Sequence, residues 1–384
     1  MTTLDGDDAT EVGTPLRLCC YVGSDELGGM EMSVATLLAG LDDSFDVTIM
    51  GVSTLVVEML TRGRPTARSM IVPAVQNKLD IRSIVAHVRA LRELRPDLLL
   101  ANLAQLYDAQ YAMLAAQLNR VPTVAVAHCV LPAASSSQRL SFNFLFRRVQ
   151  ALGGVSRSVC AQVEEALARS PGSVALLYNG VPDCEARLEA NATDGIAAGK
   201  FVVGAVGRLV HEKGFDVLIR ALPKLEDVHL VVVGDGPERQ NLEHLGESLG
   251  MDDRITFAGW SDAPWTSQWR FDALAVPSRV EGFGLVAVEG LLAEVPVVAS
   301  KVGGLTEVLQ DGTTGVLVPV DDPTALADAL RALQHDPDLQ VRLARDGRRD
   351  ARERFSVEAM VRAYERFFVE PGHTRAERAR QKLC

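Results

Sequence analysis

The sequence predicts two doubly wound α/β domains in tandem, each built on a parallel sheet that is covered by helices on both faces. Short runs that are apolar on both faces recur along the chain, and stretches with helical spacing separate several of them. The length of 384 residues suits two domains. Open sheets of this kind bind ligands at the carboxyl ends of their strands, so we expect the domains to face each other across a cleft.

The first half of the chain holds seven predicted strands, rich in leucine or in β-branched residues. They are Leu16–Val22, Asp46–Val52, Ser69–Pro73, Asp97–Ala101, Thr123–His128, Gln150–Gly154 and Val174–Tyr178. Apolar residues at helical spacing, from Met30 to Leu41 and from Ile81 to Leu91, predict helices between these strands.

The second half repeats this alternation and predicts a second sheet. Its predicted strands are Phe201–Val206, His229–Val233, Ile255–Ala258, Ala273–Val276, Val295–Ala299 and Val316–Val318. Its predicted helices are Phe215–Leu222, Glu238–Leu249, Gly290–Ala293, Thr324–Leu333, Leu339–Phe355 and Val357–Val369.

A composition change separates the two halves. Residues 182–199 are rich in Asp, Glu, Ala and Gly and poor in large apolar side chains, which indicates a linker. We therefore expect a first domain over residues 1–181 and a second over residues 200–355. The final helix and tail, residues 356–384, are expected to pack back on the first domain. The tail is basic but lacks aromatic residues, so we do not expect it to bind a membrane surface.

The charge balance restricts the class of ligand. With 39 Lys and Arg against 50 Asp and Glu, the formal net charge is −11. A hydrophobic fraction of 47% excludes a disordered chain. The acidic excess argues against nucleic-acid binding, which needs a basic face. Any anionic ligand must therefore be met by a few local cations.

Targeting and cysteine patterns predict a cytoplasmic protein. Residues 1–14 contain acidic but no basic side chains, so no signal peptide is expected. No stretch approaches the ~18–20 uncharged apolar residues of a spanning helix. The six cysteines form no CxxC pair, which favours reduced thiols over disulfides or a metal site.

Gly28 and Gly29 follow the first predicted strand and open the first predicted helix. Glycine lets a backbone approach a ligand closely, and a helix N-terminus offers free N–H groups, so this turn suits a phosphate. A tight strand-to-helix turn explains the same residues without a ligand. The pattern is not the GxGxxG fingerprint of dinucleotide binding.

Arg208 and Lys213 flank a short loop after the first strand of the second domain. An arginine fork and a lysine point charge together suit a diphosphate. Either cation alone would more simply be a solvated surface charge, but both at one strand end indicate a binding site.

The strongest motif follows the predicted strand that ends at Val276. It places Glu281 in a loop at a carboxyl edge, beside Gly282 and Gly284, and Glu289 early in the next helix. Two carboxylates so placed can accept hydrogen bonds from two sets of sugar hydroxyls. A general acid and base pair for hydrolysis is an alternative, and Glu289 alone could simply favour a helix N-terminus.

With these motifs in this order, the sequence resembles the retaining, nucleotide-sugar-dependent glycosyltransferases of family four, which have the two-Rossmann-domain glycosyltransferase B fold. The resemblance is dense in the second domain and thinner in the first. Its second-domain motifs are Gly207-Arg208, Lys213-Gly214, Gly234–Pro237, the two glutamates, Pro296–Ser300, Gly303-Gly304, Glu307 and Gly312–Pro319. Its first-domain motifs are Gly28-Gly29, His128 and Asn179–Val181.

The resemblance implies a role for each site residue, with the donor bound mainly by the second domain and the acceptor by the first. Arg208 and Lys213 would bind the donor diphosphate and stabilise the leaving group. Glu281 would bind hydroxyls of the donor sugar, Glu289 the ribose, and His128 would lie beside the transferred sugar. The remaining implied donor contacts involve the backbones of Gly28, Gly29, Phe283, Gly284 and Leu285.

Two positions depart from the family pattern. Cys129 follows His128 where many relatives have an aspartate, and Glu294 stands where relatives have a small residue. The first departure concerns the acceptor side of the site, and neither removes a residue implied to bind the donor.

The expected reaction needs no metal and no cofactor. No Asp-x-Asp motif ends a predicted strand, so we expect Arg208, Lys213 and helix N-termini to neutralise the departing diphosphate. The resemblance implies retention of anomeric configuration, by front-face attack in which the leaving phosphate takes the acceptor proton.

The expected donor is a UDP- or GDP-sugar. The expected acceptor is a small soluble metabolite or a cell-envelope precursor, lipid-linked acceptors remaining open, and Leu131–Leu145 is the candidate acceptor loop.

Three other functions compete with transfer. A nucleotide-sugar 2-epimerase shares the fold, but the spaced glutamates and the two cations disfavour it. A non-catalytic sugar-nucleotide-binding subunit is disfavoured by the intact set of Arg208, Lys213, Glu281 and Glu289. A dehydrogenase would need the glycine fingerprint that both domains lack.

Overall fold

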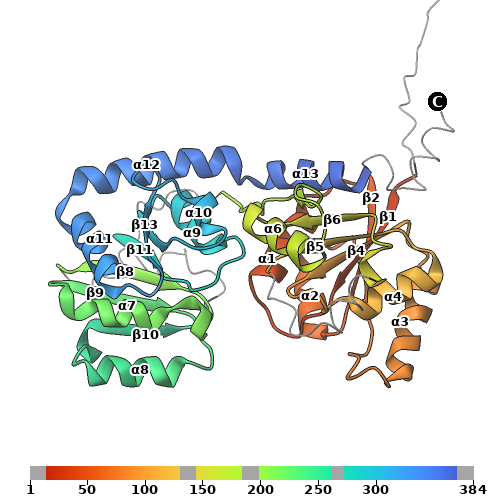
Figure 1. Ribbon diagram of the computed structural model, residues 1–384, viewed down its shortest axis with the longest axis horizontal. Helices are drawn as coiled ribbons and strands as arrows, with labels where there is room; N and C mark the ends of the chain where they lie inside the picture. The colour runs from red at the N-terminus through yellow and green to blue at the C-terminus, as the bar shows by residue number, and fades with distance from the viewer. Residues whose placement is uncertain (1–13, 130–143, 184–198, 262–270, 370–384) are drawn as a thin grey trace, which may run out of the picture.

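The computed structural model describes residues 14–129, 144–183, 199–261 and 271–369. Figure 1 shows two α/β domains side by side, with α12 (Pro337–Arg354) along the second domain and α13 (Val357–Val369) along the first. Most of the expected linker, most of the expected acceptor loop and the basic tail lie outside the described residues.

The first domain contains a seven-stranded sheet in the order β3-β2-β1-β4-β5-β6-β7, and all of its strand pairs are parallel. Its strands are β1 (Leu16–Val22), β2 (Phe45–Gly51), β3 (Arg68–Ile71), β4 (Leu98–Leu103), β5 (Thr123–Ala127), β6 (Ala151–Gly154) and β7 (Ala175–Leu176). The strand order reverses beside β1, which is where doubly wound sheets open a crevice at their carboxyl edge.

The second domain contains a six-stranded parallel sheet in the order β10-β9-β8-β11-β12-β13. Its strands are β8 (Phe201–Val206), β9 (Val228–Val233), β10 (Ile255–Gly259), β11 (Ala273–Val276), β12 (Val297–Ser300) and β13 (Val316–Val318). The order reverses beside β8, so the two sheets share one topological plan and confirm the predicted fold class.

Helices connect the strands in both domains. In the first domain they are α1 (Gly29–Gly40), α2 (Thr54–Gly63), α3 (Ile81–Leu94), α4 (Gln110–Asn119) and α6 (Arg157–Ala166). In the second they are η1 (His211–Lys213), α7 (Phe215–Ala221), η2 (Leu222–Lys224), α8 (Arg239–Ser248), η3 (Asp252–Arg254), α9 (Leu285–Leu292), α10 (Leu305–Val308) and α11 (Pro323–His335), followed by α12 and α13. None of the helices in these ranges has the length and apolar character needed to span a bilayer.

One predicted helix was wrong in its bounds. The sequence placed it at Gly290–Ala293, whereas α9 covers Leu285–Leu292 and begins directly after Gly284. Most residues of this short helix are apolar and buried, so no polar face marks its first turn. The periodicity therefore indicated a helix but not the residue at which it begins.

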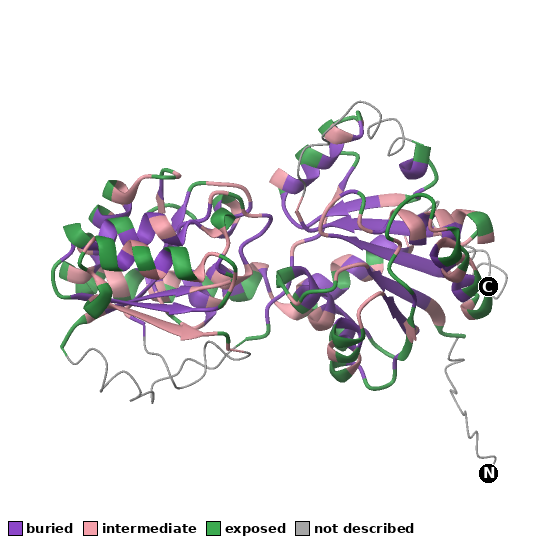
Figure 2. Cartoon of the chain, turned by 90° about the horizontal axis from the view of Figure 1, so that it is seen from below, coloured by how far each residue is buried: buried purple, intermediate pink, exposed green. Residues whose placement is uncertain are grey.

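Burial is concentrated on the central strands of both sheets, as Figure 2 shows, whereas the edge strands β3, β7 and β10 contain no buried residue. Every residue of β4 is buried, as expected for a central strand of a parallel sheet covered on both faces. One apolar cluster continues from the first domain into α9 of the second, so buried side chains join the two domains.

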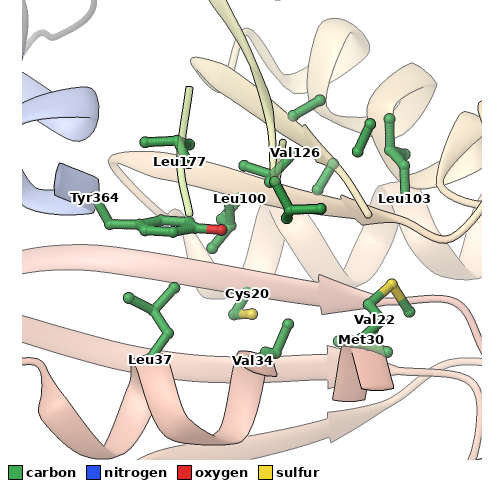
Figure 3. Packing of buried hydrophobic residues seen from close by; sticks show 14 of the residues in the cluster. Cys20, Val22, Met30, Val34, Leu37, Leu100, Leu103, Val126, Leu177 and Tyr364 are labelled. Atoms are coloured by element: carbon green, nitrogen blue, oxygen red, sulfur yellow. The ribbon is translucent and has the colours of Figure 1, made fainter. Parts of the chain in front are cut away.

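Helix α13 completes the core of the first domain. The side chain of Tyr364 lies among buried residues of the first sheet, near Leu100 and Leu177 (Figure 3). Phe368 is fully buried, and its ring meets that of Phe45 edge-on at a centroid distance of 5.9 Å. Helix α13, the last described segment of the chain, therefore packs on the N-terminal domain.

Candidate active site

The predicted site residues follow the carboxyl ends of strands in both domains. His128 follows β5 of the first sheet, Arg208 follows β8 of the second, and Glu281 follows β11. Because β8 and β11 are neighbours, their carboxyl ends bring the two second-domain loops together.

Lys213 and Glu281 form a half-buried ion pair. The Nζ atom of Lys213 lies 2.7 Å from Oε2 of Glu281, and the side chains retain 30% and 13% of their exposure. The hydroxyl of Ser278 donates to the same carboxylate oxygen at 3.2 Å. The structure therefore unites two residues to which the sequence assigned separate ligand contacts.

Arg279 holds the same loop from its other side. Its guanidinium donates two parallel hydrogen bonds of 2.8 Å to the carboxylate of Asp216, and its Nε donates to Asp321 at 2.7 Å. Hydrogen bonding to Asp216 raises the pKa of Arg279. Sequence reasoning missed this brace because no local pattern relates Arg279 to a carboxylate 63 residues away.

Arg208 reaches the first domain. Its Nη1 forms an ion pair with Oε2 of Glu26, which lies in the loop between β1 and α1. Both side chains are more than half exposed, so solvent weakens the pair. The predicted phosphate-binding cation thus lies beside the predicted phosphate-binding loop of the other domain.

Gly28 and Gly29 occupy the start of α1. The backbone N–H of Gly28 donates to Oε2 of Glu31 at 2.8 Å, and Ser24 donates to the other oxygen of that carboxylate. This capping box occupies the Gly28 N–H, so Gly28 has a structural role at the helix start. A β-carbon added at Gly29 would lie 3.3 Å from Leu285, which shows that the two predicted loops face each other across the domain boundary.

Gly282 lies against the backbone of the first domain. A β-carbon at this position would lie 2.0 Å from the backbone oxygen of His128, a distance that no side chain tolerates. Gly284 has φ 105° and caps the start of α9, a conformation that glycine adopts without strain. The glycines of the motif therefore let the Glu281 loop lie against His128.

His128 is buried, with 8% of its surface exposed. Its Nε2 lies 3.4 Å from Oδ1 of Asn102, and the amide nitrogen of Asn102 donates to the carbonyl of Tyr21 at 3.2 Å. Because that carbonyl can only accept, Oδ1 of Asn102 faces the histidine and Nε2 carries the proton. Burial lowers the pKa of His128 to about 4, so the ring is neutral at pH 7.

Asn102 was not predicted as a site residue. Its signal in the sequence is a single polar side chain next to the last residue of the otherwise apolar strand β4, and it is 1% exposed. A buried amide with defined partners at a carboxyl strand end points to a positioning role.

The side chain of Phe283 is buried in an aromatic cluster. It is 3% exposed and packs against Tyr178 and Phe355, with ring centroids 5.8 and 5.4 Å away. Any donor contact by this residue is therefore left to its backbone, as the resemblance implied.

Glu289 lies further along α9 than its motif predicted. It is the fifth residue of Leu285–Leu292, and the first turn of this helix has no acidic residue. The alternative in which Glu289 only stabilises a helix N-terminus is therefore wrong, because that effect is confined to the first turn.

Comparisons with known proteins match both halves of the chain. The family model "Glycosyltransferase Family 4" matches residues 27–183, and "Glycosyl transferases group 1" matches residues 187–350. Lipopolysaccharide core biosynthesis glycosyltransferase LpsD of Rhizobium meliloti is 40% identical over 167 residues, which are 44% of this chain and 49% of that protein. D-inositol 3-phosphate glycosyltransferase of Mycolicibacterium gilvum is 36% identical over 209 residues, 51% of this chain and 47% of that protein. The chain thus matches about half the length of these curated relatives.

A solved structure extends the likeness to nearly the whole chain. HepE of Anabaena, in complex with UDP and glucose, superposes with a TM-score of 0.81 and 22% identity, covering 92% of this chain and 99% of that chain. This likeness shows that both domains, and their order along the chain, follow the fold of that protein.

Proposed function

The chain belongs to the family-four type of glycosyltransferases with the two-domain glycosyltransferase B fold, and from this we propose that it transfers a sugar from a nucleoside-diphosphate sugar to an acceptor hydroxyl. The observation that carries the proposal is the meeting of the two domains at Gly282, which brings the Lys213–Glu281 pair beside His128. A donor bound to the second domain would there present its sugar to the first.

We propose the donor roles that the family resemblance implies, and the chemistry of the residues is compatible with them. Arg208 and Lys213 would bind the diphosphate, Glu281 the sugar hydroxyls, and Glu289 the ribose. An ammonium has three donors, so Lys213 can contact a phosphate while it holds Glu281. Neutral His128 would lie beside the sugar without adding a charge. HepE was solved with UDP and glucose, which makes UDP-glucose the first donor to test, with GDP-sugars next.

Charge stabilisation by the protein would suffice for the leaving group. Two cations and the backbone N–H groups at the start of α9 can neutralise a departing diphosphate, so we propose transfer without a divalent ion. Retention of anomeric configuration would follow from attack on the face that the diphosphate leaves, with that phosphate taking the acceptor proton.

The acceptor side is proposed only by chemical class. The relatives named above act in lipopolysaccharide core biosynthesis and on D-inositol 3-phosphate, so a cell-envelope precursor or a small polyol are the two acceptors to try first. We propose that the reaction takes place in the cytoplasm.

A thermal-shift screen tests the proposal without knowledge of the acceptor. UDP, GDP, ADP and their glucose conjugates are added singly, and a ligand at 100 times its Kd stabilises the fold by about 2.7 kcal/mol. Release of glucose from the best conjugate then reports turnover with water as acceptor. Failure of all six ligands to shift unfolding would contradict the proposal. Conversion of a glucose conjugate to its epimer in the absence of any acceptor would indicate the epimerase. Binding of a conjugate with no transfer to any added acceptor would indicate a binding subunit.

A further inference from the structure

Glu307 of the second domain caps a helix of the first. It lies on α10, and its two carboxylate oxygens accept hydrogen bonds from the backbone N–H groups of Arg157 and Ser158, at 3.0 and 3.1 Å. These are the first two residues of α6. A carboxylate is favourable at a helix N-terminus because it satisfies free N–H groups and faces the positive end of the dipole.

Ser156 connects the start of α6 to the loop from Pro277 to Gly284, which carries Glu281 and which we call the donor loop. Its hydroxyl accepts from Val159 as the N-cap of α6 and donates to the carbonyl of Gly282 at 2.7 Å. On the other side, the N–H of Gly304, which directly precedes α10, donates to the carbonyl of Glu281 at 3.1 Å. The backbone carbonyls of Glu281 and Gly282 are therefore both held. Ser156 of the first domain holds the Gly282 carbonyl, and Gly304, next to the helix that carries Glu307, holds the Glu281 carbonyl.

Tyr178 closes this arrangement. Its hydroxyl donates to Oε2 of Glu307 at 2.9 Å, and its ring packs on Phe283 and Phe355. Ser156, Tyr178 and Glu307 form what we call the interdomain clasp. Ser156 and Tyr178 contact the donor loop directly. Glu307 lies on α10, which follows Gly304, and Gly304 is hydrogen-bonded to that loop.

We propose that Glu307 is a positioning residue: through the interdomain clasp it sets the Glu281 loop against His128, and so aligns the donor sugar between the domains. This role rests on the proposed function and adds to it a second group of residues, whose hydrogen-bond partners are groups of the donor loop, of α6 and of the clasp itself. The physical basis is that a charge-assisted hydrogen bond to two fixed N–H groups defines both distance and direction, whereas apolar contacts alone allow sliding.

The test compares Glu307→Ala with Asp322→Ala. Asp322 is also a carboxylate on two backbone N–H groups at a helix start, with Thr324 and Ala325 at 3.0 and 2.9 Å, but its helix lies within the second domain. Both variants are expected to unfold at a somewhat lower temperature. Only Glu307→Ala should reduce kcat for release of glucose, by about 10- to 100-fold, the effect expected when one or two charge-assisted hydrogen bonds are lost.

Binding measurements separate positioning from a merely structural role. Calorimetry with the nucleoside diphosphate that passes the thermal screen, and with its glucose conjugate, should show unchanged affinity for the diphosphate in Glu307→Ala. In the same variant, the difference in affinity between the glucose conjugate and the diphosphate alone should become smaller. Glu307→Gln keeps one acceptor oxygen and should recover part of kcat. A cycle with His128→Ala should be non-additive, because both residues act on the same alignment.

Three results would overturn the positioning role. These are an equal loss of kcat in Asp322→Ala, full kcat in Glu307→Ala, or additive effects with His128→Ala. A wild-type protein that binds no nucleoside diphosphate would instead remove the proposed function and the positioning role together.

Discussion

His128 shows how a single residue depends on both domains. Its ring is enclosed in the first domain, its backbone carbonyl touches Gly282 of the second, and Asn102 orients its Nε2–H. Its position at the carboxyl end of a strand could be predicted from the sequence. Its neutral state and its tautomer could not, because they depend on burial and on an amide from the neighbouring strand.

Burial of neutral His128 makes stability depend on pH. The pKa is about 4 in the folded protein against an ordinary value of 6.5, so between these values the unfolded state binds the extra proton. The contribution of this group is present above pH 6.5 and is lost as pH falls toward 4, by about 3 kcal/mol in all.

Urea unfolding of wild type and His128→Gln at pH 7, 6, 5 and 4 measures this contribution. Other titrating groups cancel in the difference between the two proteins. The gap in unfolding free energy should change in favour of the variant as pH falls. Parallel pH profiles would contradict the assignment of a neutral buried ring.

The cations are the second prediction at this scale. Arg208→Ala and Lys213→Ala should each reduce kcat by about 10²- to 10³-fold, the loss typical of one charged contact to a developing anion. Lys200→Ala serves as the control, because Lys200 also forms an exposed ion pair but lies at the opposite end of β8. If either site variant retained near-full turnover while Lys200→Ala behaved as wild type, the diphosphate site would lie elsewhere.

At the scale of elements, the loop from Pro277 to Gly284 is held by both domains. Arg279 braces it against α7, the Lys213 ammonium holds its carboxylate, and the interdomain clasp holds its backbone. The sequence predicted this loop, with Glu281 in it and Glu289 on the helix that follows. It missed the partners that immobilise the loop, since each is contributed by a different element.

Gly282→Ala tests the close contact of this loop. The added methyl group would lie 2.0 Å from the His128 oxygen, so the loop or the domain must move. Misplacement of reacting groups by about 1 Å can cost about 10²-fold in rate, and we expect a loss of that order in kcat. Gly63→Ala is the matched control, because its new carbon would meet its nearest neighbour at an ordinary 3.6 Å. Equal activity of the two variants would show that the Gly282 contact is not needed for turnover.

At the scale of the whole molecule, α13 ties the end of the described chain to the first domain. Phe368 is fully buried there against Phe45 and Tyr364. The helical period of this segment was evident in the sequence. That this helix packs on the first domain was an expectation, and periodicity alone does not show which surface a helix covers.

Phe368→Ala should lower the free energy of unfolding by about 3–5 kcal/mol, the cost of a large cavity in a core. Phe144→Ala, at an aromatic residue that is 66% exposed, should change it little. Urea unfolding followed by circular dichroism measures both variants. Similar stability of the two would mean that α13 does not stabilise the first domain.

The sequence by itself determined the two parallel sheets, most helices and the position of the candidate donor loops at strand ends, because apolar periodicity and short motifs are local properties. Tertiary structure alone decided which groups meet. Arg208 pairs with Glu26 across 182 positions, Glu307 caps α6 across 150, and Ser156 holds Gly282 across 126. Such pairs follow from the way the two domains pack against each other, and a local pattern of residues does not specify that packing.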